Sequence, residues 1–68
     1  MPLTQPGTIV RLGPERGFLR DEVNIEHAFV ASVVEGRRFE ALRVGQRVLF
    51  EPADAVTPTA RRVMVLEP

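Results

Sequence analysis

Apolar residues in this chain form short runs that are separated by glycine, proline and charged residues. β-branched and aromatic residues are frequent in these runs, and no segment sustains the apolar repeat of an amphipathic helix, which favours strands. Five strands are expected, over residues 8–12, 16–20, 27–34, 46–51 and 60–66. The pattern therefore predicts an all-β fold, a small five-stranded antiparallel barrel.

The segments between these runs carry turn and loop residues. Gly13-Pro14-Glu15 predicts a turn that joins the first two strands as a hairpin. The polar connection over residues 35–43 leaves room for a single helical turn, and residues 52–58 predict a loop. We expect three parts in the chain: a flexible leader at residues 1–6, the barrel at residues 7–66 and a short tail at residues 67–68.

The second expected strand has a basic face. Arg16, Phe18 and Arg20 alternate with Gly17 and Leu19, so the two sets point to opposite sides of the sheet. The arginine side cannot be buried, because unpaired charges are excluded from a protein core. Phe18 is therefore expected in solvent between two guanidinium groups, as a platform on which a nucleic-acid base can stack. A half-buried phenylalanine that covers the rim of the barrel is the alternative.

The third expected strand alternates as well. His27 and Phe29 share one face, and Ala28 and Val30 share the other. We assign Phe29 to the outer face, as a second exposed phenylalanine beside Phe18. His27 is the only histidine, and it has no second histidine or cysteine with which to form a metal site. We expect it at the surface or at a strand end, where it would stack on a base or form a hydrogen bond with one.

Two further phenylalanines complete the aromatic set. Phe39 interrupts the polar connection, and two positions are open to it: a third platform on a mobile loop, or a plug that pins the loop to the core. Phe50 shares a face with Val48 in the fourth expected strand, and we assign it to the core.

Length and composition limit the possible functions. Sixty-eight residues make one small domain, and such a chain buries only about 60% of its unfolded surface, so a ligand site must lie on the surface. The absence of cysteine excludes disulfides, thiolate zinc sites and a thiol nucleophile. Without a secretory signal or an apolar segment long enough to span a membrane, we expect a cytoplasmic protein with no membrane partner.

The net charge of the chain does not show whether its partner is a nucleic acid. Nine basic and nine acidic residues give a net charge of zero, so composition provides no electrostatic footprint for nucleic acid. All the basic residues are arginine, which forks onto phosphates and stacks on bases. A GC-rich genome explains that bias equally well.

Four segments occur in the order and spacing of a known family's motifs: Gly7-Thr8-Ile9 with Arg16-Gly17-Phe18-Leu19-Arg20 nine residues after the glycine, Ala28-Phe29-Val30-Ala31-Ser32, residues 39–50 and residues 58–63. They are similar to the Gly-x-Val with Lys-Gly-Phe-Gly-Phe, the Val-Phe-Val-His-Phe, the Phe-x-x-Leu-x-x-Gly-Gln-x-Val-x-Phe and the Pro-x-Ala-x-x-Val of the cold-shock domain. The resemblance covers residues 7–66 and implies a five-stranded OB-type β-barrel that binds single-stranded DNA and RNA.

The chain departs from the family pattern at several aromatic positions. Arg11 and Leu12 stand where the family has tryptophan and phenylalanine, Arg20 replaces a second phenylalanine, and Ala31 and Ser32 replace a His-Phe pair. Each stacked base contributes about 1–3 kcal/mol, so the loss of several platforms predicts binding that is micromolar or weaker. Contacts between arginine and phosphate then supply a larger share, which predicts strong salt dependence and little sequence preference.

The candidate nucleic-acid-binding residues follow from these faces and from the resemblance. Phe18, Phe29 and Phe39 would stack bases, Arg11, Arg16 and Arg20 would contact phosphate or stack, and the lower-ranked candidates are His27, Arg37, Arg38, Arg61 and Arg62. We expect a monomer that binds single-stranded RNA or DNA, with no cofactor and no metal.

Two other classes of function compete with nucleic-acid binding. An enzyme is not expected, because no paired nucleophile and base occurs in the sequence. A protein-interaction module that has lost nucleic-acid binding is the alternative, with Phe18 and Phe29 as apolar anchors for a partner. The neutral net charge favours this alternative, and so do the acidic residues near the expected platforms, which would repel phosphate: Glu15, Asp21, Glu22 and Glu26.

Overall fold

The computed structural model describes residues 4–53 and 58–66. Its elements are β1 (Gln5–Gly13), β2 (Arg16–Asp21), β3 (Glu26–Val30), the 3₁₀ turn η1 (Ala31–Val33), β4 (Val34–Glu35), the 3₁₀ turn η2 (Phe39–Ala41), β5 (Arg47–Pro52) and β6 (Ala60–Val65). Residues 1–3 of the expected leader, the middle of the expected loop at residues 52–58 and the expected tail lie outside the described residues. Gln5 and Pro6, expected in the flexible leader, belong to β1 and pair with β5. No helix in the described ranges is long and apolar enough to cross a bilayer.

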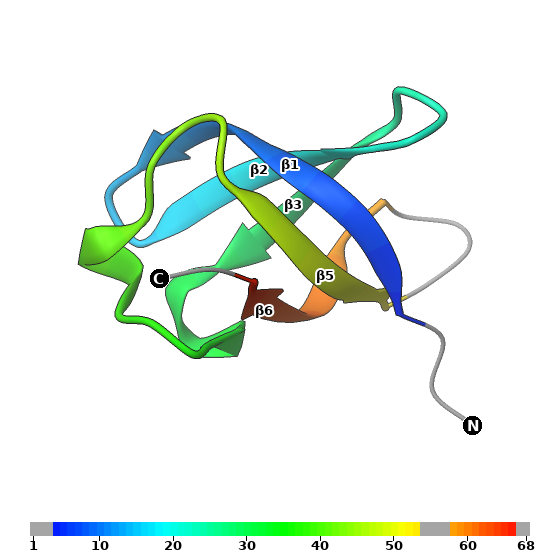
Figure 1. Ribbon diagram of the computed structural model, residues 1–68. Coiled ribbons are helices and arrows are strands. Elements are labelled where there is room, and N and C mark those ends of the chain that lie inside the picture. Colours follow the sequence, from blue (N-terminus) through cyan, green and yellow to red (C-terminus); the bar gives the residue numbers. More distant parts are fainter. Residues whose placement is uncertain (1–3, 54–57, 67–68) are drawn as a thin grey trace.

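All the strands belong to one sheet, in the order β3-β2-β1-β5-β6-β4. Neighbouring strands from β3 to β6 are antiparallel, and β4 is parallel to β6. β3, at one end of the sheet, meets the segment just before β6 where Ala28 bridges Thr59 and the Ala28 amide donates to the Pro58 carbonyl at 3.0 Å. The sheet therefore curls into a nearly closed barrel (Figure 1). The predicted all-β barrel is confirmed.

The count of five strands and the purely antiparallel arrangement are wrong. The third strand ends at Val30, earlier than the expected residue 34, because η1 turns the chain there. The two residues of β4 then pair in parallel with β6, with Val34 opposite Val63. A strand of two residues is too short to show an alternating pattern, so the sequence carried no signal for this sixth strand.

The core lies inside the barrel and is built from alternate residues of the strands. Its side chains with 0% exposure are Ile9, Leu19, Val48, Phe50 and Val63. The assignment of Phe50 to the core is therefore confirmed, and so is the inward direction of Gly17 and Leu19 in β2. Phe18, between these two residues, lies on the outer side of the barrel and is partly exposed.

Phe29 also belongs to this core, so the prediction that it is a second outward phenylalanine is wrong. Its side chain is only 2% exposed. Phe29 lies opposite Gly17 in the register of β2 and β3, and a Cβ atom on Gly17 would come within 2.6 Å of Phe29 Cζ. The glycine of the Arg-Gly-Phe segment therefore makes room for the Phe29 ring.

Phe39 takes the second of its two expected positions, the plug. Its side chain is partly buried and packs against the core, and its ring meets the Phe29 ring edge-on with the centroids 6.3 Å apart. The ring thereby holds η2 and the polar connection against the barrel. The ring is partly exposed, as that of Phe18 is, and its role as a stacking surface stays a prediction.

Candidate functional site

The outer face of β1, β2 and β3 carries Phe18 among charged side chains. Its cross-strand rows are Thr8–Arg20–Glu26, Arg11–Phe18–Ala28 and Gly13–Arg16–Val30. Three of the predicted binding arginines therefore lie around Phe18. We refer to the surface formed by Arg11, Arg16, Phe18, Arg20, Glu26, Ala28 and Val30 as the Phe18 face.

An irregularity in β1 brings Arg11 onto this face. Ile9 pairs with Leu19, yet Arg11 rather than Val10 pairs with Phe18, so Val10 is an extra residue in β1. A regular alternation from the inward Ile9 would direct Arg11 into the barrel, where an unpaired charge is costly. The bulge reverses the alternation, and Arg11 is exposed.

Arg11 covers part of Phe18 and is held there by an acid. Its Cζ atom lies 4.4 Å from the centroid of the Phe18 ring, within the range of a cation–π contact. Arg11 Nη2 donates to Glu26 Oε1 at 2.7 Å, and Arg20 Nη2 donates to Glu26 Oε2 at 3.4 Å. One carboxylate therefore serves two of the predicted phosphate-binding arginines.

Arg16 is the cation of the Phe18 face without an acidic partner. It is exposed and forms no ion pair within the described parts of the chain. It lies opposite Val30 and is the first residue of β2, directly after the hairpin turn. A guanidinium in this state keeps its donors available for a phosphate.

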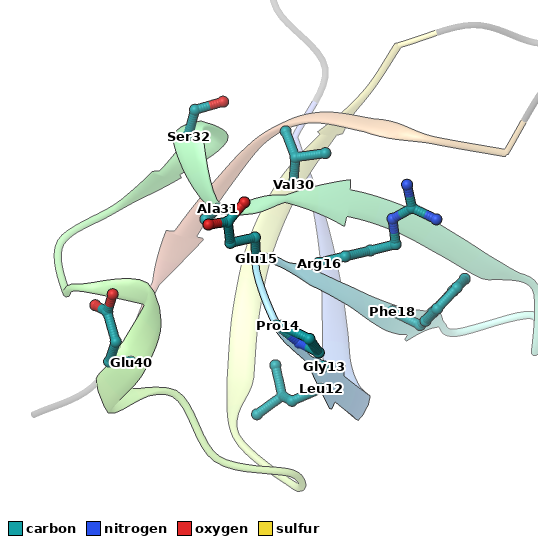
Figure 2. Close-up of a pocket in the computed structure, with 10 residues that line it drawn as sticks. All are labelled: Leu12, Gly13, Pro14, Glu15, Arg16, Phe18, Val30, Ala31, Ser32 and Glu40. Carbon is teal, nitrogen blue, oxygen red and sulfur yellow. The ribbon is translucent and has the colours of Figure 1, made fainter.

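A hollow of about 800 Å³ opens beside Phe18 and Arg16. Figure 2 shows Arg16 and Phe18 at one end of this hollow and Glu40 at the other. Leu12 and Val30 form an apolar part of the lining, and Glu15 contributes a second carboxylate beside that of Glu40. The hollow thus combines an aromatic ring, one cation and two acceptor groups, a lining that suits a planar polar group better than a purely apolar one.

His27 is buried one residue from the start of β3, so its predicted place at the surface is wrong. It is 8% exposed, its ring centroid is 4.7 Å from that of Phe50, and its Nε2 is 2.9 Å from Asp21 Oδ2. Because an ionised carboxylate only accepts hydrogen bonds, Nε2 carries the proton and donates. Asp21 satisfies Nε2 and Phe50 packs on the ring, whereas Nδ1 is buried with no hydrogen-bond partner among the described residues. His27 cannot reach a base on the Phe18 face.

Asp21 organises the connection between β2 and β3. Its Oδ1 accepts hydrogen bonds from the backbone amides of Val23 and Ile25, both at 2.9 Å. Burial acts to raise the pKa of Asp21, but the hydrogen bonds from His27 and from these two amides, with the charge of His27, outweigh it and hold the pKa below its usual value of 3.8. The ionised form is therefore the one that the fold stabilises.

We expect Asp21 to make the domain sensitive to acid. A pKa that is lower in the folded state contributes stability that is fully present above the ordinary value of 3.8 and is lost as the pH falls through the folded value. Urea unfolding from about pH 7 to about pH 2 should show a smaller acid-induced loss of stability in Asp21→Asn than in the wild type. Equal losses in the two proteins would contradict this role.

Arg37 and Arg38 lie on the polar connection and not on the Phe18 face. Arg38 is largely exposed and comes only within 4.0 Å of Glu40. Arg37 is partly buried and precedes η2 in the sequence. Their contact with a nucleic-acid backbone stays a prediction.

Arg61 and Arg62 form a separate charged cluster on β6. Glu51 is buried at 6% exposure, and its two oxygens accept from Arg61 Nε and Arg62 Nη1, each at 3.3 Å. Arg62 also donates to both oxygens of Glu35, and these hydrogen bonds raise the pKa of Arg62 further. Both arginines therefore have a structural task, because a buried carboxylate needs partners.

Sequence reasoning named most of the Phe18 face but overlooked Glu26 as a partner of its arginines. The contact joins residues 15 positions apart in the chain. It depends on the bulge at Val10 and on the register that sets Arg20 opposite Glu26. The one available signal was opposite charge, which many pairs in this sequence share.

No family model matches the sequence of this chain, and no curated protein does. Among solved structures the chain is similar to the Drosophila structure described as Unr CSD456, a cold-shock-domain structure, with a TM-score of 0.79 and 26% sequence identity. The match covers 98% of this chain but only 28% of the other. Cold-shock domains are nucleic-acid-binding modules at the level of the family.

The match agrees with the curled sheet and with the order of motifs along the chain. The protein therefore has the fold of a cold-shock domain, an OB-type β-barrel, and the family resemblance predicted from its sequence is confirmed.

Proposed function

We propose that the Phe18 face binds single-stranded nucleic acid, RNA or DNA, weakly and with little sequence preference. The observation that carries this proposal is a partly exposed Phe18 with Arg11, Arg16 and Arg20 around it on one open sheet surface. An aromatic ring stacks on any base, and guanidinium groups pair with the backbone phosphates regardless of sequence. Such a surface holds a strand in its unpaired form without any chemical step.

The expected affinity is low because the face offers a single ring. Phe29 and His27 are buried and Phe39 packs against the core, so Phe18 is the one aromatic side chain that the described residues present there. Stacking of one base supplies about 1–3 kcal/mol, which alone corresponds to very weak binding. Contacts between arginine and phosphate supply the rest, and a rise in salt weakens them.

Titration of the ¹⁵N-labelled protein with single strands of DNA and RNA of about eight nucleotides tests this proposal. We expect saturable amide shifts on the outer residues of β1, β2 and β3, clustered around Phe18 and Arg16, and smaller shifts as salt is raised. Amides of β5 around Glu51 and of β6 around Arg62 provide the internal reference, because neither strand contributes a residue to the Phe18 face. No shift at millimolar oligonucleotide in low salt would refute the proposal.

A second candidate function, docking of a protein partner, is favoured by the loop between β2 and β3. Val23 and Ile25 are 72% and 49% exposed there, and the loop projects away from the barrel (Figure 1). The hydrogen bonds to Asp21 hold this loop in one shape, which lowers the entropic cost of presenting two aliphatic side chains to a partner. A mutation of Val23 that weakens partner binding but leaves the oligonucleotide titration unchanged would separate the two functions.

A further inference from the structure

We infer that Glu26 is an internal competitor of phosphate on the Phe18 face and thereby sets its affinity. This inference rests on the proposed function. The carboxylate of Glu26 occupies the donors of Arg11 and Arg20 that a strand would use, and it holds Arg11 over the ring on which a base would stack.

When no ligand is bound, Glu26 forms a closer ion pair with Arg11 than with Arg20. Their ion pair is short, 2.7 Å, whereas Arg20 reaches the same carboxylate at 3.4 Å. The Glu26 side chain is 33% exposed and that of Arg11 is 61% exposed, so the acid is the more firmly enclosed partner. Arg11 is therefore the member that can swing towards solvent, while Glu26 stays on the sheet.

Two consequences follow for a bound strand. The three side chains together carry one net positive charge, so the face attracts phosphate less than two free arginines would. A base that stacks on Phe18 must also displace the guanidinium of Arg11 from the ring. Because ion pairs near the surface are individually weak, phosphate can replace the carboxylate, and Glu26 lowers the affinity without abolishing it.

Replacement of Glu26 by glutamine removes the competing charge and keeps the size of the side chain. Glu22→Gln is the matched control, since Glu22 is exposed and has no ion pair within the described residues, yet its substitution changes the net charge equally. The dissociation constant of a fluorescein-labelled single strand of about eight nucleotides is measured by anisotropy over a range of salt concentrations for the wild type and both variants.

We expect E26Q to bind about 3–10-fold more tightly than the wild type at low salt. Its plot of log K against log salt should be steeper by about 0.7 for each additional phosphate that is neutralised. Glu22→Gln should leave that slope unchanged. In the absence of nucleic acid, the Arg11 Nε–H resonance should shift in E26Q and not in Glu22→Gln, and a dispersed amide spectrum shows that each variant is folded.

The results separate this inference from the proposed function. Equal affinities and slopes for E26Q and Glu22→Gln, with the wild type still binding, would overturn the role of Glu26 and leave the proposed function standing. Absence of binding by all three proteins at low salt would overturn both. A tighter E26Q with an unchanged slope would also contradict the inference, because no additional phosphate would then be engaged.

Discussion

Phe29→Ala is expected to lower the free energy of unfolding by about 3–5 kcal/mol, which is most of the stability of a domain this small. The ring is 2% exposed, packs over Gly17 and meets the edge of Phe39. Its removal leaves a cavity that the surrounding strands, tied into a barrel, cannot close. Urea unfolding followed by circular dichroism measures the loss, and collapse of the amide dispersion would report complete unfolding.

Phe18→Ala provides the control for that experiment. Phe18 belongs to the same strand pair but lies on the outer face and is partly exposed, so its truncation should cost far less stability. The contrast between the two phenylalanines tests the assignment of the inner and outer faces of the barrel. Similar unfolding free energies for the two variants would show that Phe29 is not a core residue.

Phe18→Ala is also expected to weaken the binding of single-stranded nucleic acid by about 5- to 150-fold, the equivalent of one lost stacking contact. The Arg11 guanidinium would then lose the ring on which it lies, although its partner Glu26 remains. Anisotropy at constant low salt gives the change in the dissociation constant, and the unfolding curve shows that the fold persists.

Two further variants make the result specific. Phe18→Leu keeps an apolar side chain of similar size but lacks a π face, so it should lose nearly as much affinity as Phe18→Ala. Val44→Ala removes apolar surface at a site that is 63% exposed and lies outside the Phe18 face, and it should leave binding unchanged. An unaltered dissociation constant in Phe18→Ala would exclude Phe18 as a stacking platform.

The sequence was sufficient for most of the strands and for the two faces of β2. Charged residues on both sides of Phe18 could point only outwards, so Gly17 and Leu19 had to point inwards. Phe50 likewise shares its face with Val48, whereas the other face of that strand carries Arg47, Leu49 and Glu51. In β2 the opposite phase would bury two arginines, and that cost made the prediction correct. β5 obeys this rule less strictly, because Glu51 on its other face is buried at 6% exposure and paired with Arg61 and Arg62.

The faces of β3 were predicted wrongly because the expected strand began at His27 and so left out Glu26, the formally charged residue that shares a face with Ala28 and Val30. Ala28 and Val30 form one apolar face, whereas the other combines Phe29 with His27. A histidine in a strand favours the solvent-facing side, but here Asp21 accepts a hydrogen bond from Nε2 of the buried ring. That hydrogen bond crosses from the end of β2, and no local pattern reveals it.

The register between β1 and β2 explains why the residues of the outer surface could be predicted only in part from the sequence. The bulge at Val10 can be located only once β1 is aligned with β2, because the apolar alternation in β1 is compatible with several registers. The contact between Arg11 and Phe18, and the acid that holds Arg11, follow from that alignment.

The extra residue in β1 has a consequence for how such a surface can diversify. Deletion of Val10 would remove the bulge and leave Arg11 opposite Phe18. Deletion of Arg11 would instead set Val10 opposite Phe18, while the ring itself and the core behind it keep their identities. An aliphatic side chain would then lie beside the Phe18 ring in place of the guanidinium, without any substitution in β2 or β3. In this barrel, then, the register of an adjacent strand is as much a determinant of ligand chemistry as the side chains of the site.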